Sequence, residues 1–218
     1  QQGIKTMIEL HTAATPNGRK VSIMLEELAL PYEVHKVDIG AGDQFKPDFL
    51  KISPNNKIPA IIDRDTPAGE QSVFESGAIL IYLAEKTGSA LFPSSGPARV
   101  ATLEWLMFQM GGLGPMFGQL GHFAVFAKEE VPYGIKRYKE ETDRILGVLD
   151  KRLGENEFVA GAYSIADIAI YPWLFGLKFY QEKTDAKLNF PDTPNIERWQ
   201  AAISERPAVE KGMALLQG

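Results

Sequence analysis

The first third of the chain mixes short strand-like runs with apolar residues at helical spacing. Residues 7–12 and 32–38 have the composition of strands, and apolar side chains between residues 21 and 28 recur on one helix face. Pro31 ends that helix. A strand, a helix and a strand joined by a crossover of this length predict a parallel pair of strands with a right-handed connection.

A second group of elements follows this unit. Residues 46–52 predict one or two helical turns, and residues 59–63 and 72–74 predict two strands joined by a polar turn short enough for a hairpin. A helix over residues 75–86 comes next. Together these elements predict a mixed sheet with helices packed against it.

Beyond residue 87 the strand-like patterns nearly vanish. Residues 88–96 are rich in glycine and serine, which is typical of a linker. We therefore predict an α/β domain over residues 7–87, a linker over residues 88–96, and an all-helical domain over residues 97–218.

Three features mark the helical part. We expect a kink or break at Pro115, because proline lacks the N–H that a helix interior needs. Ser164 and Asp167 form a capping pair ahead of an apolar run. A last helix is expected between Pro194 and Pro207.

Composition and charge exclude several classes of protein. Hydrophobic residues make up 44% and charged residues 23% of the chain, which is ordinary for a globular protein. No run approaches the roughly 20 apolar residues of a membrane-spanning helix, and residues 1–6 do not have the pattern of a signal peptide. A net charge of −5 with interspersed signs argues against a nucleic-acid partner. We expect a cytoplasmic protein with no membrane or nucleic-acid partner.

The chain contains no cysteine, so it has no disulfide, no thiolate metal site and no thiol nucleophile of its own. Any thiol chemistry would need a thiol carried in by a ligand. The three histidines, His11, His35 and His122, do not have the spacing of metal ligands, and we expect no metal site.

Two polar segments could carry chemistry or simple structure. Thr15-Pro16-Asn17-Gly18 fits an ordinary helix start, but such a start also presents free N–H groups and partial positive charge that stabilise a thiolate. Residues 55–60 fit a loop entering a strand. If the Ile58–Pro59 bond is cis, an extended peptide could pair with the main chain of Ile58.

A third segment, residues 74–79, opens a helix with Glu75 and Ser76. This is normal capping chemistry, yet Glu75 can accept from an ammonium group while Ser76 and the helix amides hold a carboxylate. An α-amino acid head group carries both charges side by side. The three segments together would suit a small zwitterionic peptide that carries a thiol.

These segments, in this order and in this layout, resemble the glutathione transferases from residue 7 to about residue 212. The resemblance implies a thioredoxin-like α/β N-terminal domain that binds glutathione, followed by an all-α C-terminal domain. A closer similarity, to the nu-class proteins of bacteria and their fungal relatives, rests on the strings TPNG, ISPNNKIPAI, FESGAILIYLAEKTG, MGGLGPMFGQ and VPYGIKRY.

The resemblance implies a role for each matching residue. Thr15 and Asn17 would contact the glutathione sulfur as catalytic residues. The implied glutathione-binding residues are Gln44 and Lys57 at the glycyl end, Ile58 and Pro59 at the cysteinyl backbone, Glu75 and Ser76 at the γ-glutamyl group, and Arg137 near a second glutathione. Phe108, Met116 and Phe117 either line an adjoining pocket or belong to the core.

The implied activity is glutathione-dependent disulfide reduction with weak transferase activity, using one or two glutathione molecules per subunit as co-substrate. Two alternatives stay open, namely conjugation of glutathione to electrophiles and a non-catalytic glutathione-binding module. A homodimer is implied by the family alone.

Overall fold

The computed structural model describes residues 8–185 and 187–216, which form two compact units. One unit takes in the chain up to Ser89 and again from Arg206, and the other is Ala90–Glu205. The first boundary, between Ser89 and Ala90, falls within the predicted linker, whereas the second was not expected from the sequence pattern. Residue 7, where the α/β domain was expected to begin, lies outside the described residues.

A four-stranded mixed sheet forms the framework of the first unit. β1 (Ile8–Thr12) pairs in parallel with β2 (Tyr32–Lys36), and antiparallel with β3 (Ala60–Asp63), which pairs antiparallel with β4 (Gln71–Phe74). The order across the sheet is β2-β1-β3-β4. The predicted parallel pair and the predicted hairpin are both confirmed, although β2 ends two residues earlier than expected.

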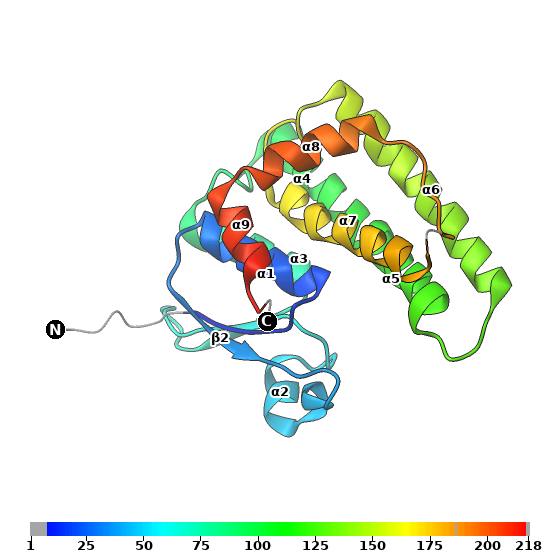
Figure 1. Cartoon of the computed structure of the whole chain (residues 1–218). Helices are drawn as coiled ribbons and strands as arrows, with labels where there is room; N and C mark the ends of the chain where they lie inside the picture. The colour runs from blue at the N-terminus through cyan, green and yellow to red at the C-terminus, as the bar shows by residue number, and fades with distance from the viewer. Residues whose placement is uncertain (1–7, 186, 217–218) are drawn as a thin grey trace. The chain divides into compact units, whose positions relative to one another are not determined.

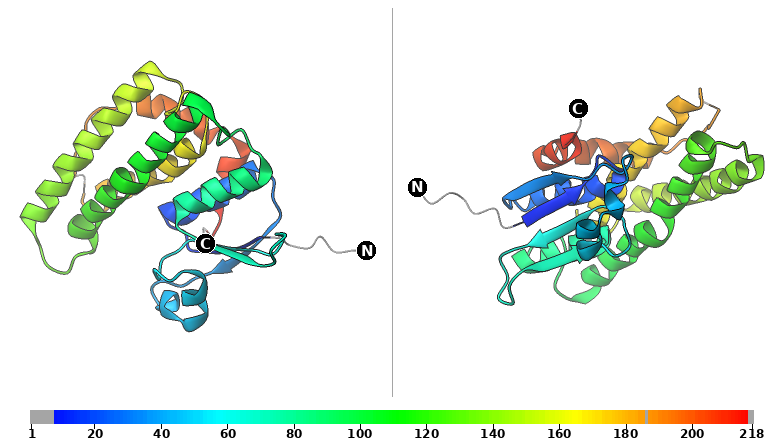
Figure 2. Two further views of the ribbon diagram at one scale, coloured as in Figure 1. Left: turned by 180° about the vertical axis from the view of Figure 1, so that it is seen from behind. Right: turned by 90° about the horizontal axis from the view of Figure 1, so that it is seen from below.

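Helices lie on both sides of this sheet. α1 (Pro16–Glu27) and α3 (Ser76–Thr87) lie on one face, and the short α2 (Pro47–Ile52) lies on the other side (Figures 1 and 2). The side chains of β1 explain why α1 and α3 cover one face. Ile8 and Leu10 point to that face and are fully buried, whereas Glu9 and His11 alternate with them and point to the opposite face. The buried side chains of β1 and α1 therefore form one core.

The first unit is completed by a helix from the far end of the chain, α9 (Pro207–Ala214), which packs against α1 (Figure 1). Ser22 Oγ donates to the carbonyl of Gly212 at 2.7 Å. A Cβ at Gly212 would lie 2.5 Å from Ile23 Cα, so only glycine allows this approach. The sequence pattern used Pro207 as an end signal, but proline is equally favoured in the first turn of a new helix.

The second unit is helical. Its α-helices are α4 (Gly96–Phe108), α5 (Gly114–Gly121), α6 (Pro132–Glu155), α7 (Ile165–Lys183) and α8 (Pro194–Ser204). The expected interruption near Pro115 is a π-helical turn over Gln109–Leu113, directly before α5, while Pro115 itself lies in the first turn of α5. Leu113 and Gly114 keep helical backbone angles, so the proline lies in a continuous helical run that the wider π-helical turn interrupts just before it.

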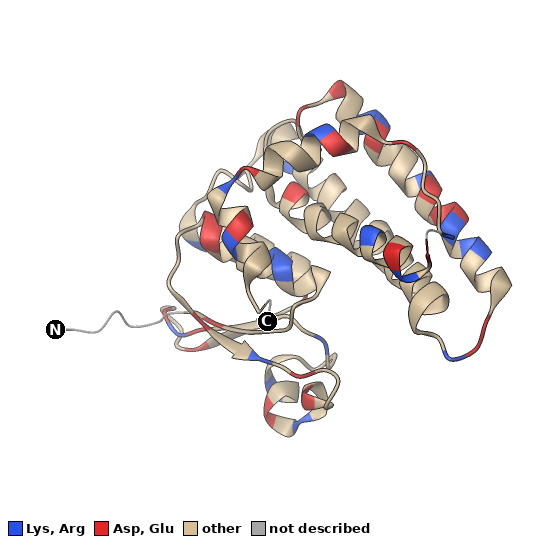
Figure 3. Cartoon of the chain, in the orientation of Figure 1, with Lys and Arg blue, Asp and Glu red and all other residues tan. Residues whose placement is uncertain are grey.

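Charged residues of both signs alternate along α6 (Figure 3), where Lys139 pairs with Asp143 and Arg144 pairs with Glu141. These residues are three or four positions apart, which places the partners next to each other on the helix. Among the described helices, none combines the length and the apolar character that crossing a membrane would require.

Candidate functional site

The sheet register brings the three polar segments to one edge. His11 of β1 lies beside Ala60 of β3, and Ala60 lies beside Phe74 of β4, so these three residues form one row. The chain leaves β1 and β4 at this row and enters β3 at it. The segments that meet there are residues 13–18, residues 55–59 and residues 75–76.

Thr15 caps the N-terminus of α1. Its Oγ1 accepts a hydrogen bond from the Gly18 N–H at 3.1 Å, and Pro16 and Asn17 occupy the first turn. The structural interpretation of this segment is therefore correct, but it leaves room for the chemical one. A hydroxyl cap uses one lone pair, so its proton can still be donated to an anion at the helix end.

Gly18 has a packing role that the sequence pattern did not reveal. A Cβ at this position would lie 2.2 Å from the Ala13 carbonyl oxygen and 2.4 Å from Thr12 Oγ1. Glycine thus allows the first turn of α1 to pack directly against the end of β1. The position of Thr15 and Asn17 depends on this close approach.

The loop before β3 presents main chain that the fold does not use. The Ile58–Pro59 peptide is cis. Among the described residues, no hydrogen bond involves the N–H or the C=O of Ile58. The Lys57 carbonyl accepts from Ser53 Oγ at 2.7 Å, and the Lys57 side chain is exposed.

Gln44 lies in a short 3₁₀ turn over Asp43–Phe45. Its Nε2 donates to the Ile39 carbonyl at 3.2 Å, whereas its Oε1 is shielded from solvent and has no partner among the described residues. An amide has two N–H donors. Gln44 can therefore both donate and accept one more hydrogen bond.

Glu75 and Ser76 lie at the start of α3. Glu75 is exposed and has a left-handed φ of 71°, a conformation that costs a residue other than glycine about 1–3 kcal/mol. Ser76 is almost fully buried. Strain of this kind at a helix start that exposes a carboxylate favours a binding role over a purely structural one.

Lys20 is the residue that sequence reasoning missed. Its side chain is fully buried, and its ammonium nitrogen lies 3.2 Å from Ser76 Oγ. Burial lowers the pKa of Lys20 to about 7, although the Glu75 carboxylate acts in the opposite direction. The sequence gives only a weak signal for this burial, namely the largely apolar run 21–25 directly after Lys20, and the structure shows that this run is buried throughout.

The remaining expected residues belong to the second unit. Arg137 lies on α6, where its guanidinium is exposed and acts on Glu141, whose pKa is lowered mainly by its hydrogen bond with Arg144. Phe117 is fully buried and belongs to the core, whereas Phe108 and Met116 are only partly buried.

Comparison with known proteins agrees with this geometry. The family model of the glutathione S-transferase N-terminal domain matches residues 14–86, and that of the glutathione S-transferase C-terminal domain matches residues 114–207. The chain belongs to the glutathione S-transferase family. The resemblance found in the motifs, and the fold class that it implied, are confirmed.

Individual relatives match this glutathione S-transferase along nearly its whole length. It is 49% identical over 214 residues to the disulfide-bond oxidoreductase YfcG of Escherichia coli (strain K12), covering 97% of this chain and 95% of YfcG. It is 48% identical, with a TM-score of 0.88, to a glutathione transferase family member from Pseudomonas fluorescens pf-5 with two glutathione bound, covering 97% and 94% of the two chains.

A third relative is a glutathione transferase from Pseudomonas putida with one glutathione disulfide bound per subunit. Its structure matches with a TM-score of 0.90 and 45% identity, and the match covers 99% of this chain and 94% of the other. Relatives of this glutathione S-transferase have therefore been crystallised both with the thiol and with its oxidised dimer.

Proposed function

We propose that the protein reduces disulfide bonds by using bound glutathione as the thiol, with weak transferase activity as a secondary property. The observation that carries the proposal is the absence of any cysteine in a chain whose relatives include a disulfide-bond oxidoreductase. A cysteine-free protein needs a thiol from its ligand, and the helix start at Thr15 offers that thiol a place to ionise.

The reaction runs in two balanced steps. The thiolate of one glutathione attacks one sulfur of the substrate disulfide, which forms a mixed disulfide and releases the other sulfur as a thiolate. A second glutathione thiolate attacks the glutathione sulfur of the mixed disulfide. Glutathione disulfide and the second substrate thiolate leave, so two glutathione molecules are oxidised for each disulfide reduced.

Thr15 and Asn17 stabilise the first thiolate in this proposal. The Thr15 hydroxyl proton and the Asn17 side-chain amide are donors at the N-terminus of α1, where the helix dipole already favours negative charge. The protein supplies position and a lowered thiol pKa, and the ligand supplies the sulfur.

The other segments hold the rest of glutathione. Ile58, kept beside Pro59, offers its unpaired main chain to the cysteinyl residue, and Gln44 and Lys57 face the glycyl carboxylate. Glu75 accepts from the γ-glutamyl ammonium, while Ser76 and the first amides of α3 hold the adjacent carboxylate. Arg137 contributes to binding the second glutathione through its exposed cation.

We further infer a homodimer in the cytoplasm, with small disulfides or electrophiles as substrates. Homodimerisation follows from the family, and the cytoplasm is a compartment where glutathione is kept reduced, as this reaction requires. Conjugation of electrophiles is the main alternative, since it would use the same first site. A non-catalytic glutathione-binding module is the second alternative. The presence of Glu75 and Ser76 argues only against a site that has lost glutathione binding.

Asn17→Ala is expected to lower kcat/KM for glutathione-dependent reduction of a small model disulfide by about tenfold, which corresponds to about 1.5 kcal/mol, the lower end of what a hydrogen bond to a charged group contributes. The assay couples glutathione disulfide formation to glutathione reductase and runs beside aryl halide conjugation. Asn189→Ala, an exposed position in the second unit, is the matched control. Full activity of Asn17→Ala would remove Asn17 from the site, and faster conjugation than reduction by the wild type would favour the transferase alternative.

Because the pKa of Lys20 is lowered, we expect the protein to take up protons when it binds glutathione. With a pKa of about 7, half of the Lys20 side chains are neutral at that pH, and a carboxylate bound at Ser76 favours the charged form. S-methylglutathione, which lacks a free thiol, is expected to bind with uptake of up to about half a proton at pH 7, and more weakly as the pH rises to 9. Calorimetry in buffers of different ionisation enthalpy measures this uptake. The uptake should disappear in Lys20→Met, and an unchanged uptake there would assign it to another group.

A further inference from the structure

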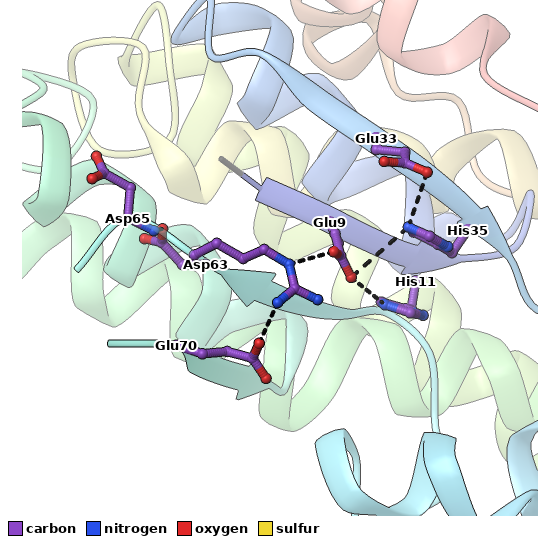
Figure 4. A network of polar contacts seen from close by, with 8 residues as sticks. Glu9, His11, Glu33, His35, Asp63, Asp65 and Glu70 are labelled. Carbon is purple, nitrogen blue, oxygen red and sulfur yellow. Dashed lines mark hydrogen bonds and ion pairs between the residues drawn. The ribbon is translucent and has the colours of Figure 1, made fainter. Parts of the chain in front are cut away.

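The face of the sheet opposite α1 and α3 carries a cluster of side chains that the proposed function does not use. Because β1 and β2 are parallel and in register, Glu9 lies beside Glu33 and His11 lies beside His35. All four side chains alternate with the core residues of their strands and point to this outer face (Figure 4).

Three donor atoms converge within the cluster. Glu9 Oε2 lies 3.6 Å from His11 Nε2 and 3.9 Å from His35 Nε2, and the three ligand atoms all lie within 4.8 Å of one another. The two imidazole rings are stacked, with centroids 4.6 Å apart. Each Nε2 atom is shielded from solvent and has no hydrogen-bond partner among the described residues.

The charge around these atoms is negative. Arg64 binds the other oxygen of Glu9 and also pairs with Glu70, and the Glu33 carboxylate lies 3.5 Å from His35 Nε2 (Figure 4). Three carboxylates and one guanidinium leave a formal charge of −2. The Arg64 contact also fixes the Glu9 carboxylate so that Oε2 faces the histidines, as a hydrogen-bonded partner behind a metal ligand does.

We propose that Glu9, His11 and His35 form a binding site for a divalent zinc-like cation. Two imidazoles and one carboxylate are a ligand set that zinc prefers, with a fourth position left for water. Bond lengths of about 2.0–2.1 Å around a tetrahedral ion place neighbouring donors roughly 3.4 Å apart. The carboxylate–imidazole distances of 3.6 and 3.9 Å are close to this separation. Because the two rings are stacked, binding also requires them to turn about their side-chain bonds so that both Nε2 lone pairs point at the ion.

A cavity borders the site. His11 lines a cavity of about 500 Å³ on the outer face of the sheet, next to α2, together with Asp43, Phe49 and Ile62. The spacing of the histidines in the sequence concealed the site, because 24 positions separate His11 from His35 and only the strand register brings them together.

The test uses tag-free full-length protein in the absence of glutathione, which binds zinc itself. Equilibrium dialysis against Zn²⁺, with metal analysis of the protein, is expected to give one bound ion per chain. His11→Gln and His35→Gln should each weaken this binding more than tenfold, and Glu9→Gln should weaken it as well. His122→Gln, which alters the remaining histidine, should leave it unchanged.

A second measurement does not depend on how well the variants fold. In the wild type, Zn²⁺ should shift the NMR resonances of two histidine rings and leave the third in place. Co²⁺ should give the intense visible absorption of a tetrahedral site without a thiolate band. No stoichiometric binding by the wild type, or equal losses in His122→Gln and His11→Gln, would overturn the proposal.

Discussion

Replacing Asp167 with alanine is expected to lower the free energy of unfolding by about 3–5 kcal/mol, the largest effect of any single change considered for this protein. Asp167 is fully buried, and its carboxylate accepts four hydrogen bonds from Val159 N–H, Ser164 N–H, Ser164 Oγ and Trp199 Nε1 at 2.8–3.2 Å. Alanine would leave all four donors buried without an acceptor.

The charge state of Asp167 supports this expectation. Burial raises the pKa of Asp167 to about 6, and the hydrogen bonds from its four donors act in the opposite direction. The carboxyl is therefore ionised at pH 7.5 and can accept from every donor. The Ser164–Asp167 pair forms a capping box at the start of α7, but the bonds to Val159 and Trp199 extend it into a network that connects α7 to α8.

Urea denaturation at pH 7.5 measures the loss. Glu140→Ala is the control, because Glu140 pairs with Lys136 on the exposed surface of α6 and a surface ion pair contributes only about 0–1 kcal/mol. Residual folded Asp167→Ala protein should retain its affinity for glutathione, because Asp167 serves folding and not the proposed site. A loss below 1 kcal/mol would mean that water replaces the missing acceptor.

The order of strands and helices in the first unit could be predicted because each signal there is local. Alternation in β1, the apolar spacing of α1 and the short turn before β4 each depend on neighbouring residues. The packing of α9 on α1 could not be predicted in the same way. It depends on Gly212, which allows a close approach between segments almost 190 residues apart in the chain.

In the candidate site, too, the residues with local sequence signals could be predicted and those that depend on packing could not. Thr15, Ile58 and Glu75 belong to short segments whose composition already suggested a helix start, a turn and a charged helix start. Lys20 was missed because a lysine in a helix usually lies on its exposed face, and only the packing around α1 buries it against Ser76. The His11–His35 pair was missed because strand register is a property of the sheet.

Glu75→Gln is expected to weaken glutathione binding by roughly tenfold to a hundredfold, the largest functional effect among the substitutions in the proposed site. A charge-assisted hydrogen bond contributes about 1.5–3 kcal/mol, and glutamine keeps the size and backbone demands of glutamate while losing the charge. Calorimetric titration with glutathione measures the loss. Glu210→Gln, which removes an exposed carboxylate from α9 in the same unit, should bind as the wild type does.

The left-handed backbone of Glu75 allows stability and function to be separated. Glu75→Gly relieves the strain at φ 71°, so it is expected to match or exceed the wild type in thermal stability while binding glutathione as weakly as Glu75→Gln. A glutathione analogue without the γ-glutamyl amino group completes a double-mutant cycle. The wild type should lose affinity for this analogue, whereas Glu75→Gln should bind it and glutathione about equally. If the variant still preferred glutathione by the full wild-type ratio, the ammonium group would be recognised by another residue.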